Sequence, residues 1–177
     1  MSTRLRLAAL LLLIGGHAGG AEPPAPKATE VRTAIFAGGC FWCIEADFEK
    51  LPGVLAAESG YTGGRTANPS YEQVSAGNTG HTEAIRVSYD PQRVSYPQLL
   101  DYFWRHIDPT VRNRQFCDVG TQYRSGIYWQ NEAERKAAES SRDALLASSK
   151  LPHIETEIVA AATFYPAEEY HQDYYKK

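Results

Sequence analysis

The sequence predicts an α+β fold in which a mixed sheet and its packed helices form two layers. Segments with strand character and segments with helical character interleave along the chain, without the strict alternation of a doubly wound parallel fold. The chain shows no internal repeat. Its 177 residues suit one domain with a real core, since 43% are hydrophobic and 22% are charged. We therefore expect a single α+β domain.

The first half of this domain combines short strands with one amphipathic helix. A run rich in strand formers ends at two glycines, Gly38 and Gly39. From Cys40 onward apolar residues recur at helical spacing, and Pro52-Gly53 ends the helix. The expected elements are a strand over 32–37, a helix over 40–51, a strand over 54–61, a polar loop over 62–70, a turn or short helix over 71–75 and an alternating strand over 81–89.

The second half contains two helices separated by a long irregular segment. Pro97 lies in the first turn of one helix, where proline is tolerated, and Asn131 is placed to cap the other. Residues 108–122 lack periodicity, and such a segment in a compact domain is usually functional or disordered. The expected elements are a helix over 96–107, a loop over 108–122, a strand over 123–129, a helix over 131–148, a half-buried strand over 154–161 and a tyrosine-rich short helix or coil over 168–177.

The N-terminal segment is predicted to be a secretory signal peptide over residues 1–21. Arg4 and Arg6 precede a short apolar run, and small residues follow before a cleavage point expected near Ala21. The apolar run is too short to span a bilayer, which takes about 20 residues. An uncleaved signal anchor is the alternative. We expect export, in a bacterium to the periplasm.

A linker over 22–30, with three prolines in nine residues, is expected to separate the signal peptide from the folded domain over 31–177. The net charge of -3 provides no basic field for nucleic acid. Cleavage would remove two of the 18 basic residues and none of the 21 acidic ones, which leaves a mature charge of -5.

Two of the three cysteines, Cys40 and Cys43, form a CxxC pair at the predicted strand-to-helix turn, and Cys117 is distant in sequence. Free N–H groups and the positive end of the helix dipole face the first helical side chains. The Cys40 thiolate is therefore expected to be stabilised, with a pKa below the free value of about 8.5. Positions i and i+3 of a helix lie on one face, about 5–6 Å apart, within the range that a disulfide requires.

Other kinds of CxxC site fit less well. A structural disulfide between residues so close in sequence would constrain the unfolded chain little. A zinc site needs a second pair of ligands, and covalent haem attachment needs a histidine where Ile44 stands. The pattern favours redox chemistry with Cys40 as the nucleophile.

The segment Gly38-Gly39-Cys40-Phe41-Trp42-Cys43 closely resembles the active-site signature of peptide methionine-S-sulfoxide reductases of the A type. Further segments resemble this family in family order, so the resemblance covers about residues 33–174. They are Gly60-Tyr61-Thr62-Gly63-Gly64, Asn68-Pro69-Ser70-Tyr71, Thr79-Gly80-His81-Thr82-Glu83, Asp118-Val119-Gly120-Thr121-Gln122-Tyr123-Arg124-Ser125 and Tyr170-His171-Gln172.

The resemblance implies a methionine sulfoxide reductase A-like fold and a catalytic domain that repairs oxidised proteins by reducing methionine-S-sulfoxide, protein-bound and free. Cys40 would attack the sulfoxide sulfur as a thiolate. Glu83 matches the family's acid, which would protonate the oxygen and must be kept partly neutral by burial. Tyr71 and Tyr123 match the tyrosines that donate hydrogen bonds to that oxygen.

The resemblance also assigns the substrate pocket and the fate of the oxidised cysteine. Phe41 and Trp42 would form an apolar slot for the S-methyl group, and Asp118 matches a residue that lines the pocket. The sulfenic acid formed on the nucleophile would condense with Cys43. Many members carry resolving cysteines in a C-terminal tail, whereas this chain has none after Cys117, which is the alternative resolver or relay.

A thioredoxin-like dithiol protein is expected to reduce the resulting disulfide, and no metal or other cofactor is expected. His81 and His171 are expected to support the structure. Two alternatives are an exported thioredoxin-like disulfide oxidoreductase and a metal-binding module that uses the three cysteines and a histidine. The first should carry a tryptophan before the first cysteine, where Gly39 stands.

Overall fold

The computed structural model describes residues 30–149 and 151–177. The predicted signal peptide over 1–21, and the predicted linker except for Glu30, lie outside the described residues. Within the described part, no helix combines the length and the apolar character needed to cross a membrane.

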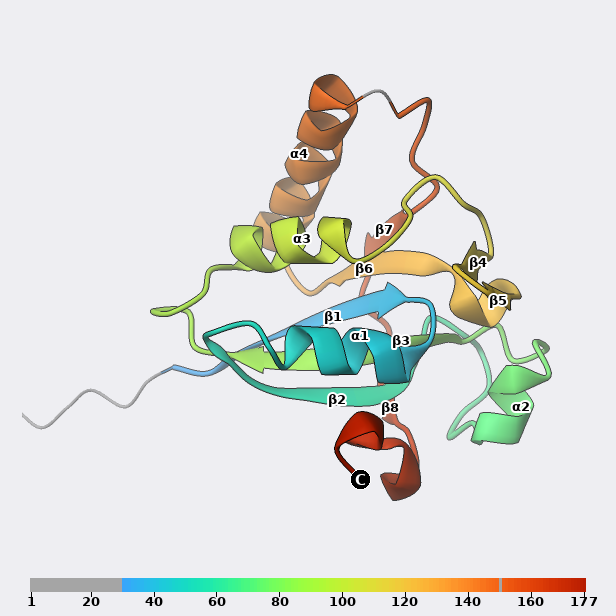
Figure 1. Cartoon of the computed structure of the whole chain (residues 1–177). Coiled ribbons are helices and arrows are strands. Elements are labelled where there is room, and N and C mark those ends of the chain that lie inside the picture. Colours follow the sequence, from blue (N-terminus) through green and yellow to red (C-terminus); the bar gives the residue numbers. More distant parts are fainter. Residues whose placement is uncertain (1–29, 150) are drawn as a thin grey trace, which may run out of the picture.

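A six-stranded sheet forms the centre of the fold, in the order β7-β6-β1-β3-β2-β8 (Figure 1). β6 and β7 run parallel, and the other neighbouring pairs are antiparallel, which confirms the predicted mixed sheet. Apolar side chains of the central strands, such as Phe36 and Ile85, are fully buried. The strands are β1 (Arg32–Gly38), β2 (Val54–Thr62), β3 (Thr82–Tyr89), β6 (Ser125–Trp129), β7 (Glu157–Ala160) and β8 (Tyr165–Pro166).

Helices α1 (Phe41–Phe48) and α3 (Tyr96–Arg105) pack on one face of the sheet, and α4 (Glu132–Ser148) packs beside α3 (Figure 1). The ring of Phe36 on β1 lies 5.2 Å from Phe48 of α1 and 5.1 Å from Phe103 of α3, measured between centroids. This aromatic cluster joins both helices to the central strand. It confirms the predicted layer of helices on the sheet.

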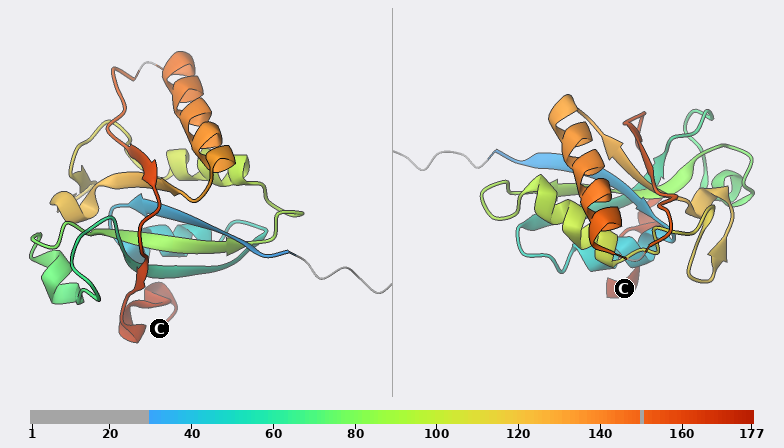
Figure 2. Two further views of the ribbon diagram at one scale, coloured as in Figure 1. Left: turned by 180° about the vertical axis from the view of Figure 1, so that it is seen from behind. Right: turned by 90° about the horizontal axis from the view of Figure 1, so that it is seen from above.

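The chain between β7 and β8 crosses the other face of the sheet (Figure 2, left). Phe164 packs there against Ile35 and Tyr128, and the guanidinium of Arg86 lies 4.9 Å above the Phe164 ring. The crossing leads to two short 3₁₀ turns, η2 (Glu169–His171) and η3 (Tyr174–Lys176), the second of which contacts α1. Residues 174–176 therefore contact the first helix of the domain.

The predicted elements are present, with several local differences. The helix predicted over 40–51 ends at Phe48, and the strand predicted over 154–161 begins only at Glu157. The segment over 108–122 is not wholly irregular, because it contains a hairpin of β4 (Arg114–Gln115) and β5 (Asp118–Val119). Tyr123 lies in the 3₁₀ turn η1 (Thr121–Tyr123), so the strand predicted over 123–129 begins only at Ser125. β8 was not predicted, since a two-residue strand leaves no periodic pattern. The remaining helix, α2 (Tyr71–Ser75), confirms the short helix expected there.

Candidate active site

The candidate nucleophile lies where β1 ends and α1 begins, as predicted. Gly39 has φ +88°, and a Cβ on it would lie 2.5 Å from the Cβ of Gln115, so no other residue fits this turn without displacing the β4–β5 hairpin. Cys40 is the N-cap residue of α1. Its half-buried side chain thus lies at the end of the helix where backbone N–H groups have no partners within the helix.

Glu83 lies on β3 next to this helix start. Its Oε2 accepts a hydrogen bond from the backbone N–H of Phe41 at 3.0 Å, and only 2% of the residue is exposed. Burial raises the pKa of Glu83 to about 7, and the charge of Asp118 adds to the rise, while the Phe41 N–H opposes it. At neutral pH the carboxyl is therefore protonated in about half of the molecules.

The thiol of Cys40 does not have the low pKa that the helix start predicts. Burial raises the pKa of Cys40 to about 12, and the neighbouring Cys43 and Glu83 raise it further, whereas the N–H groups of Cys43 and Trp42 lower it. The prediction of a lowered pKa was wrong because desolvation outweighs the backbone N–H groups at this site. The protein without substrate holds Cys40 as a neutral thiol.

Two tyrosines lie near this site on different elements. Tyr71 is the first residue of α2, and its backbone N–H donates to Glu168 Oε1 at 2.9 Å. Tyr123 lies in η1, where burial raises its pKa to about 12, and the charges of Glu83, Tyr71 and other groups of the site contribute. The Tyr123 hydroxyl therefore remains protonated at neutral pH and is able to donate a hydrogen bond.

An aromatic cluster surrounds the first turn of α1. The Phe41 ring is buried and lies 5.8 Å from Tyr61 and 6.4 Å from Tyr71, centroid to centroid. The half-buried Trp42 donates its indole Nε1–H to His171 Nδ1 at 3.0 Å and stacks on Tyr174 at 3.8 Å. Phe41 is thus buried among the other rings, while the half-buried Trp42 is held by its contacts with His171 and Tyr174.

The two histidines that were expected to be structural both hold neighbouring groups in place. His171 is 1% exposed, and burial lowers its pKa, so the neutral ring accepts from Trp42 at Nδ1 and carries its proton on Nε2. His81 accepts from the backbone N–H of Gly64 at 3.1 Å and contacts the carbonyl of Thr66 at 2.7 Å. His81 therefore fixes the loop that precedes α2.

Glu168 is a residue of the site that the sequence analysis did not identify. Its carboxylate accepts hydrogen bonds from the Tyr61 hydroxyl and the Tyr71 N–H, both at 2.9 Å. It thereby positions the start of α2 and with it the Tyr71 ring. The signal that could have revealed it is its place two residues before the matching segment Tyr170-His171-Gln172.

All three cysteines are free thiols and line one cavity of about 480 Å³. Cys43 and Cys117 are exposed, and the Sγ of Cys43 lies 3.6 Å from the hydroxyl of Tyr175. Phe116 and Asp118 of the β4–β5 hairpin also line this cavity. The hairpin therefore brings Cys117 to the same opening as the CxxC pair, although the two lie more than seventy residues apart in sequence.

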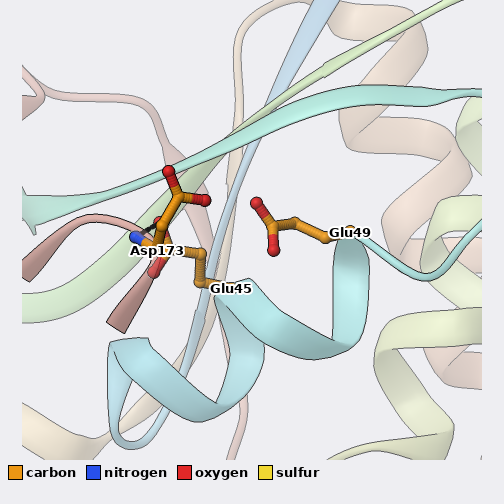
Figure 3. Close-up of side chains that lie close together, drawn as sticks. All are labelled: Glu45, Glu49 and Asp173. Carbon is orange, nitrogen blue, oxygen red and sulfur yellow. Dashed lines mark hydrogen bonds between the residues drawn. The ribbon is translucent and has the colours of Figure 1, made fainter. Parts of the chain in front are cut away.

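A compact acidic cluster lies on the other side of α1 (Figure 3). The carboxylates of Glu45, Glu49 and Asp173 have oxygens within 4.8 Å of one another, and this is the only such group of potential metal ligands in residues 30–149 and 151–177. The ammonium of Lys176 lies 2.7 Å from Glu49 and 2.8 Å from Asp173, so the chain supplies its own cation here. The three cysteines, all of which the structure describes, do not form such a group.

Comparison with known proteins agrees with this geometry. The family model described as peptide methionine sulfoxide reductase matches residues 32–177. The peptide methionine sulfoxide reductase MsrA of Bacillus pumilus is 52% identical over 145 residues, which cover 81% of this chain and 82% of that protein. The MsrA of Limosilactobacillus reuteri is 50% identical over 147 residues, which cover 82% of this chain and 84% of that protein.

Solved structures of the same kind of enzyme share the fold. Methionine sulfoxide reductase A of Corynebacterium diphtheriae superposes with a TM-score of 0.75 at 35% identity, over 85% of this chain and 76% of that one. Reduced Mxr1 of Saccharomyces cerevisiae superposes with a TM-score of 0.78 at 33% identity, over 82% of this chain and 84% of that one. Mxr1 has also been solved in complex with Trx2, and that chain is 23% identical to this one with a TM-score of 0.59. The match over nearly the whole described domain shows that this chain belongs to the peptide methionine sulfoxide reductase family.

Proposed function

We propose that this protein reduces methionine-S-sulfoxide, in proteins and as the free amino acid, through the thiol of Cys40. The observation that supports this most directly is the pairing of Cys40 with Glu83 across the first turn of α1. Glu83 is buried, bonds to the Phe41 N–H at 3.0 Å and has a pKa of about 7. It is therefore able both to give and to take a proton at neutral pH.

The chemical step moves an oxygen atom from the substrate to the enzyme. Glu83 donates its proton to the sulfoxide oxygen, which makes the sulfur electrophilic, and the sulfur of Cys40 attacks it. The attack forms a bond between the two sulfur atoms. This bond and the S–O bond of the substrate then break as the hydroxyl passes to the Cys40 sulfur, so methionine leaves with two more electrons and Cys40 becomes a sulfenic acid. The resting thiol of Cys40 is protonated, so its proton must be lost as the attack begins. The Glu83 carboxylate, which has just given its own proton to the sulfoxide oxygen, is the adjacent base that takes it.

Four further residues bind the substrate in this scheme. The hydroxyls of Tyr71 and Tyr123 donate to the oxygen as negative charge grows on it. Phe41 and Trp42 form the apolar slot for the S-methyl group. The Nε1–H of Trp42 is already bonded to His171, so only the apolar face of its ring remains to contact the methyl group.

Cys43 resolves the sulfenic acid in this proposal, and Cys117 is the alternative. The thiol of Cys43 attacks the oxidised sulfur of Cys40, water leaves, and a disulfide forms. Both candidate resolvers are exposed and line the cavity that Cys40 reaches. A thioredoxin-like dithiol protein then reduces the disulfide and returns the enzyme to its starting state.

Turnover with separated epimers tests the proposed function. The protein is incubated with dithiothreitol and either the S or the R epimer of a methionine sulfoxide peptide, beside a Cys40→Ser variant. We expect reduction of the S epimer alone and no turnover in Cys40→Ser. Equal turnover of both epimers, or turnover that survives in the variant, would contradict the proposal. Reduction of disulfides without sulfoxide reduction would indicate a general disulfide oxidoreductase instead.

The two candidate resolvers are separated by single substitutions. In Cys43→Ser we expect Cys40 to accumulate as sulfenic acid after one turnover, detected by a dimedone adduct and mass spectrometry. Cys117→Ser serves as the matched control and should recycle with thioredoxin normally. Undiminished thioredoxin-dependent turnover in Cys43→Ser would assign the resolving role to Cys117.

We further propose that the chain is exported, in a bacterium to the periplasm, after cleavage near Ala21. The support is the order of Arg4 and Arg6, a short apolar run and small residues at the N-terminus. N-terminal sequencing of the protein from fractionated cells tests this proposal. A cytoplasmic protein that retains Met1 or Ser2 at its N-terminus would refute it.

A further inference from the structure

The lining of the cysteine cavity overlaps only in part with the residues proposed to bind the sulfoxide. Cys40, Cys43 and Cys117 line the cavity together with Asp118, which was expected in the substrate pocket, but Glu83, Tyr71 and Tyr123 do not. Cys40 is therefore shared by this cavity and by the group of residues that contains its acid. In the first half-reaction the sulfoxide must reach the sulfur of Cys40. In the second, the reducing dithiol must reach the disulfide that has formed.

The rim of this cavity carries exposed aromatic side chains next to charged lining residues such as Asp47 and Arg105. In the described part of the chain eight large hydrophobic residues are exposed, and five of them lie in two short segments, 116–119 and 170–175. Phe116 is 69% exposed and lines the cavity, and Tyr175 is 62% exposed with its hydroxyl 3.6 Å from the Cys43 sulfur. Phe116 thus shares a cavity with the exposed Cys43, and Tyr175 contacts it. Exposed apolar side chains gathered at one place are typical of a surface that binds another protein.

The hairpin that carries Phe116 is held rigidly. The buried side chain of Gln115 accepts from the backbone N–H of Asp108 and donates to its carbonyl, both at 2.8 Å, and its Cβ packs against Gly39. Phe116 itself has φ +49°, in the left-handed region that is unfavourable for a large side chain. The backbone therefore holds an aromatic ring outward at a position where asparagine or glycine would fit better.

We propose that Cys43, Phe116 and Tyr175 form the docking surface for the dithiol protein that reduces the enzyme. This inference rests on the proposed function and names the place where its second half-reaction occurs. The volume of about 480 Å³ falls within the range of about 300–1,000 Å³ that is common for binding pockets. A loop of the partner that carries its reactive cysteine enters the cavity.

Reduction on this surface takes two successive thiol–disulfide exchanges. A thiolate of the partner attacks the exposed Cys43 sulfur of the Cys40–Cys43 disulfide and forms a mixed disulfide. The bond to Cys40 breaks, and Cys40 leaves as a thiolate that takes up a proton. The second thiol of the partner loses its proton and attacks the partner's own bridged sulfur, which releases Cys43. The enzyme gains two electrons, and the partner is left as a disulfide.

Steady-state kinetics with two reductants test the docking surface. Phe116→Asn removes the ring and suits the left-handed backbone, and Tyr175→Ser removes the second ring independently. Leu55→Asn is the matched control, because Leu55 is 52% exposed and lies at the far end of β2 from Tyr61. With purified bacterial thioredoxin as reductant, we expect the KM for thioredoxin to rise by about tenfold in each rim variant and to stay unchanged in the control.

With dithiothreitol as reductant, kcat and the KM for a methionine-S-sulfoxide peptide should be unchanged in Phe116→Asn and in the Leu55→Asn control. An unchanged KM for thioredoxin in both rim variants would refute the docking surface and leave the proposed function intact. A rise in the KM for the peptide in place of that for thioredoxin would assign this surface to the substrate and would also refute the inference. Absence of turnover with dithiothreitol in the unaltered protein would overturn the proposed function and this inference together.

Discussion

Replacing Glu83 by glutamine separates the stability of this site from its activity. The amide oxygen of Glu83→Gln keeps an acceptor for the Phe41 N–H, which bonds to the native carboxylate at 3.0 Å. The amide has no proton to transfer and carries no charge. The substitution therefore changes the acid–base chemistry and leaves the packing of a 2% exposed residue nearly intact.

The effect on stability follows from the raised pKa. Below pH 4.5 the carboxyl is protonated in folded and unfolded chains, so it favours neither state. As the pH rises toward 7, the unfolded chain releases this proton while the folded chain retains it, and the folded state loses stability. Above pH 7 the loss is complete, and a rise in pKa from 4.5 to about 7 corresponds to about 3 kcal/mol. Glu83→Gln avoids this cost, so it should be more stable than the native protein above pH 7 and equally stable below pH 4.5.

The effect on turnover has the opposite sign. General acid catalysis contributes about 10²- to 10⁴-fold, so kcat for a methionine-S-sulfoxide peptide should fall by such a factor in Glu83→Gln. In the native protein, kcat/KM should decline above pH 7 as the carboxyl ionises, and this decline should be absent from the variant.

Urea unfolding at pH 4.5 and pH 8, together with dithiothreitol-dependent turnover from pH 5 to pH 9, measures both effects. Glu58→Gln, which alters a glutamate on the adjacent strand β2, is the control and should keep native turnover. A Glu83→Gln variant with native turnover and the native pH profile would refute the assignment of Glu83 as the acid. A variant less stable than the native protein at pH 8 would refute the argument from burial.

Four further substitutions test the supporting parts of the structure. Tyr71→Phe and Tyr123→Phe should each lower kcat by about 10²-fold in the dithiothreitol assay, because each removes one donor to the developing oxyanion. Trp42→Phe leaves the buried Nδ1 of His171 without its donor, so urea unfolding should show a loss of about 1–3 kcal/mol; an unchanged midpoint would contradict the bond at 3.0 Å. Asn131→Ala removes the side chain that caps α4 through the Glu134 N–H at 3.0 Å and should cost about 1 kcal/mol in the same assay, with turnover unaffected.

The elements predicted best are those whose boundaries depend on a local sequence signal. The double glycine before Cys40 specifies a sharp turn between β1 and α1, and Asn131 specifies the start of α4. The β4–β5 hairpin and β8 could not be predicted in this way, because two residues are too few to show an alternation. Their pairing is set by the elements they pack against.

The positions of the predicted site residues near the start of α1 could be expected from the sequence, whereas the electrostatics there could not. Resemblance placed Glu83 beside Cys40, and the raised pKa of Glu83 agrees with the burial expected for it. The pKa of Cys40 was predicted with the wrong sign, because position at a helix start can be read from the sequence whereas desolvation by distant segments cannot. Glu168 and Tyr175 act through contacts with residues more than ninety positions away, which the sequence near them does not show.

The hydrogen bond between Trp42 and His171 joins residues 129 positions apart. During synthesis the cysteine pair therefore emerges long before the histidine, the stacking Tyr174 and the last turn that complete its surroundings. Until residues 171–177 have been made, the nascent chain can form its central strands but has no finished pocket around Trp42. Chains interrupted before residue 171 should accumulate with a nearly complete sheet and with cysteine thiols that readily form disulfides with other proteins. The order of synthesis thus makes the site one of the last parts of the domain to become competent.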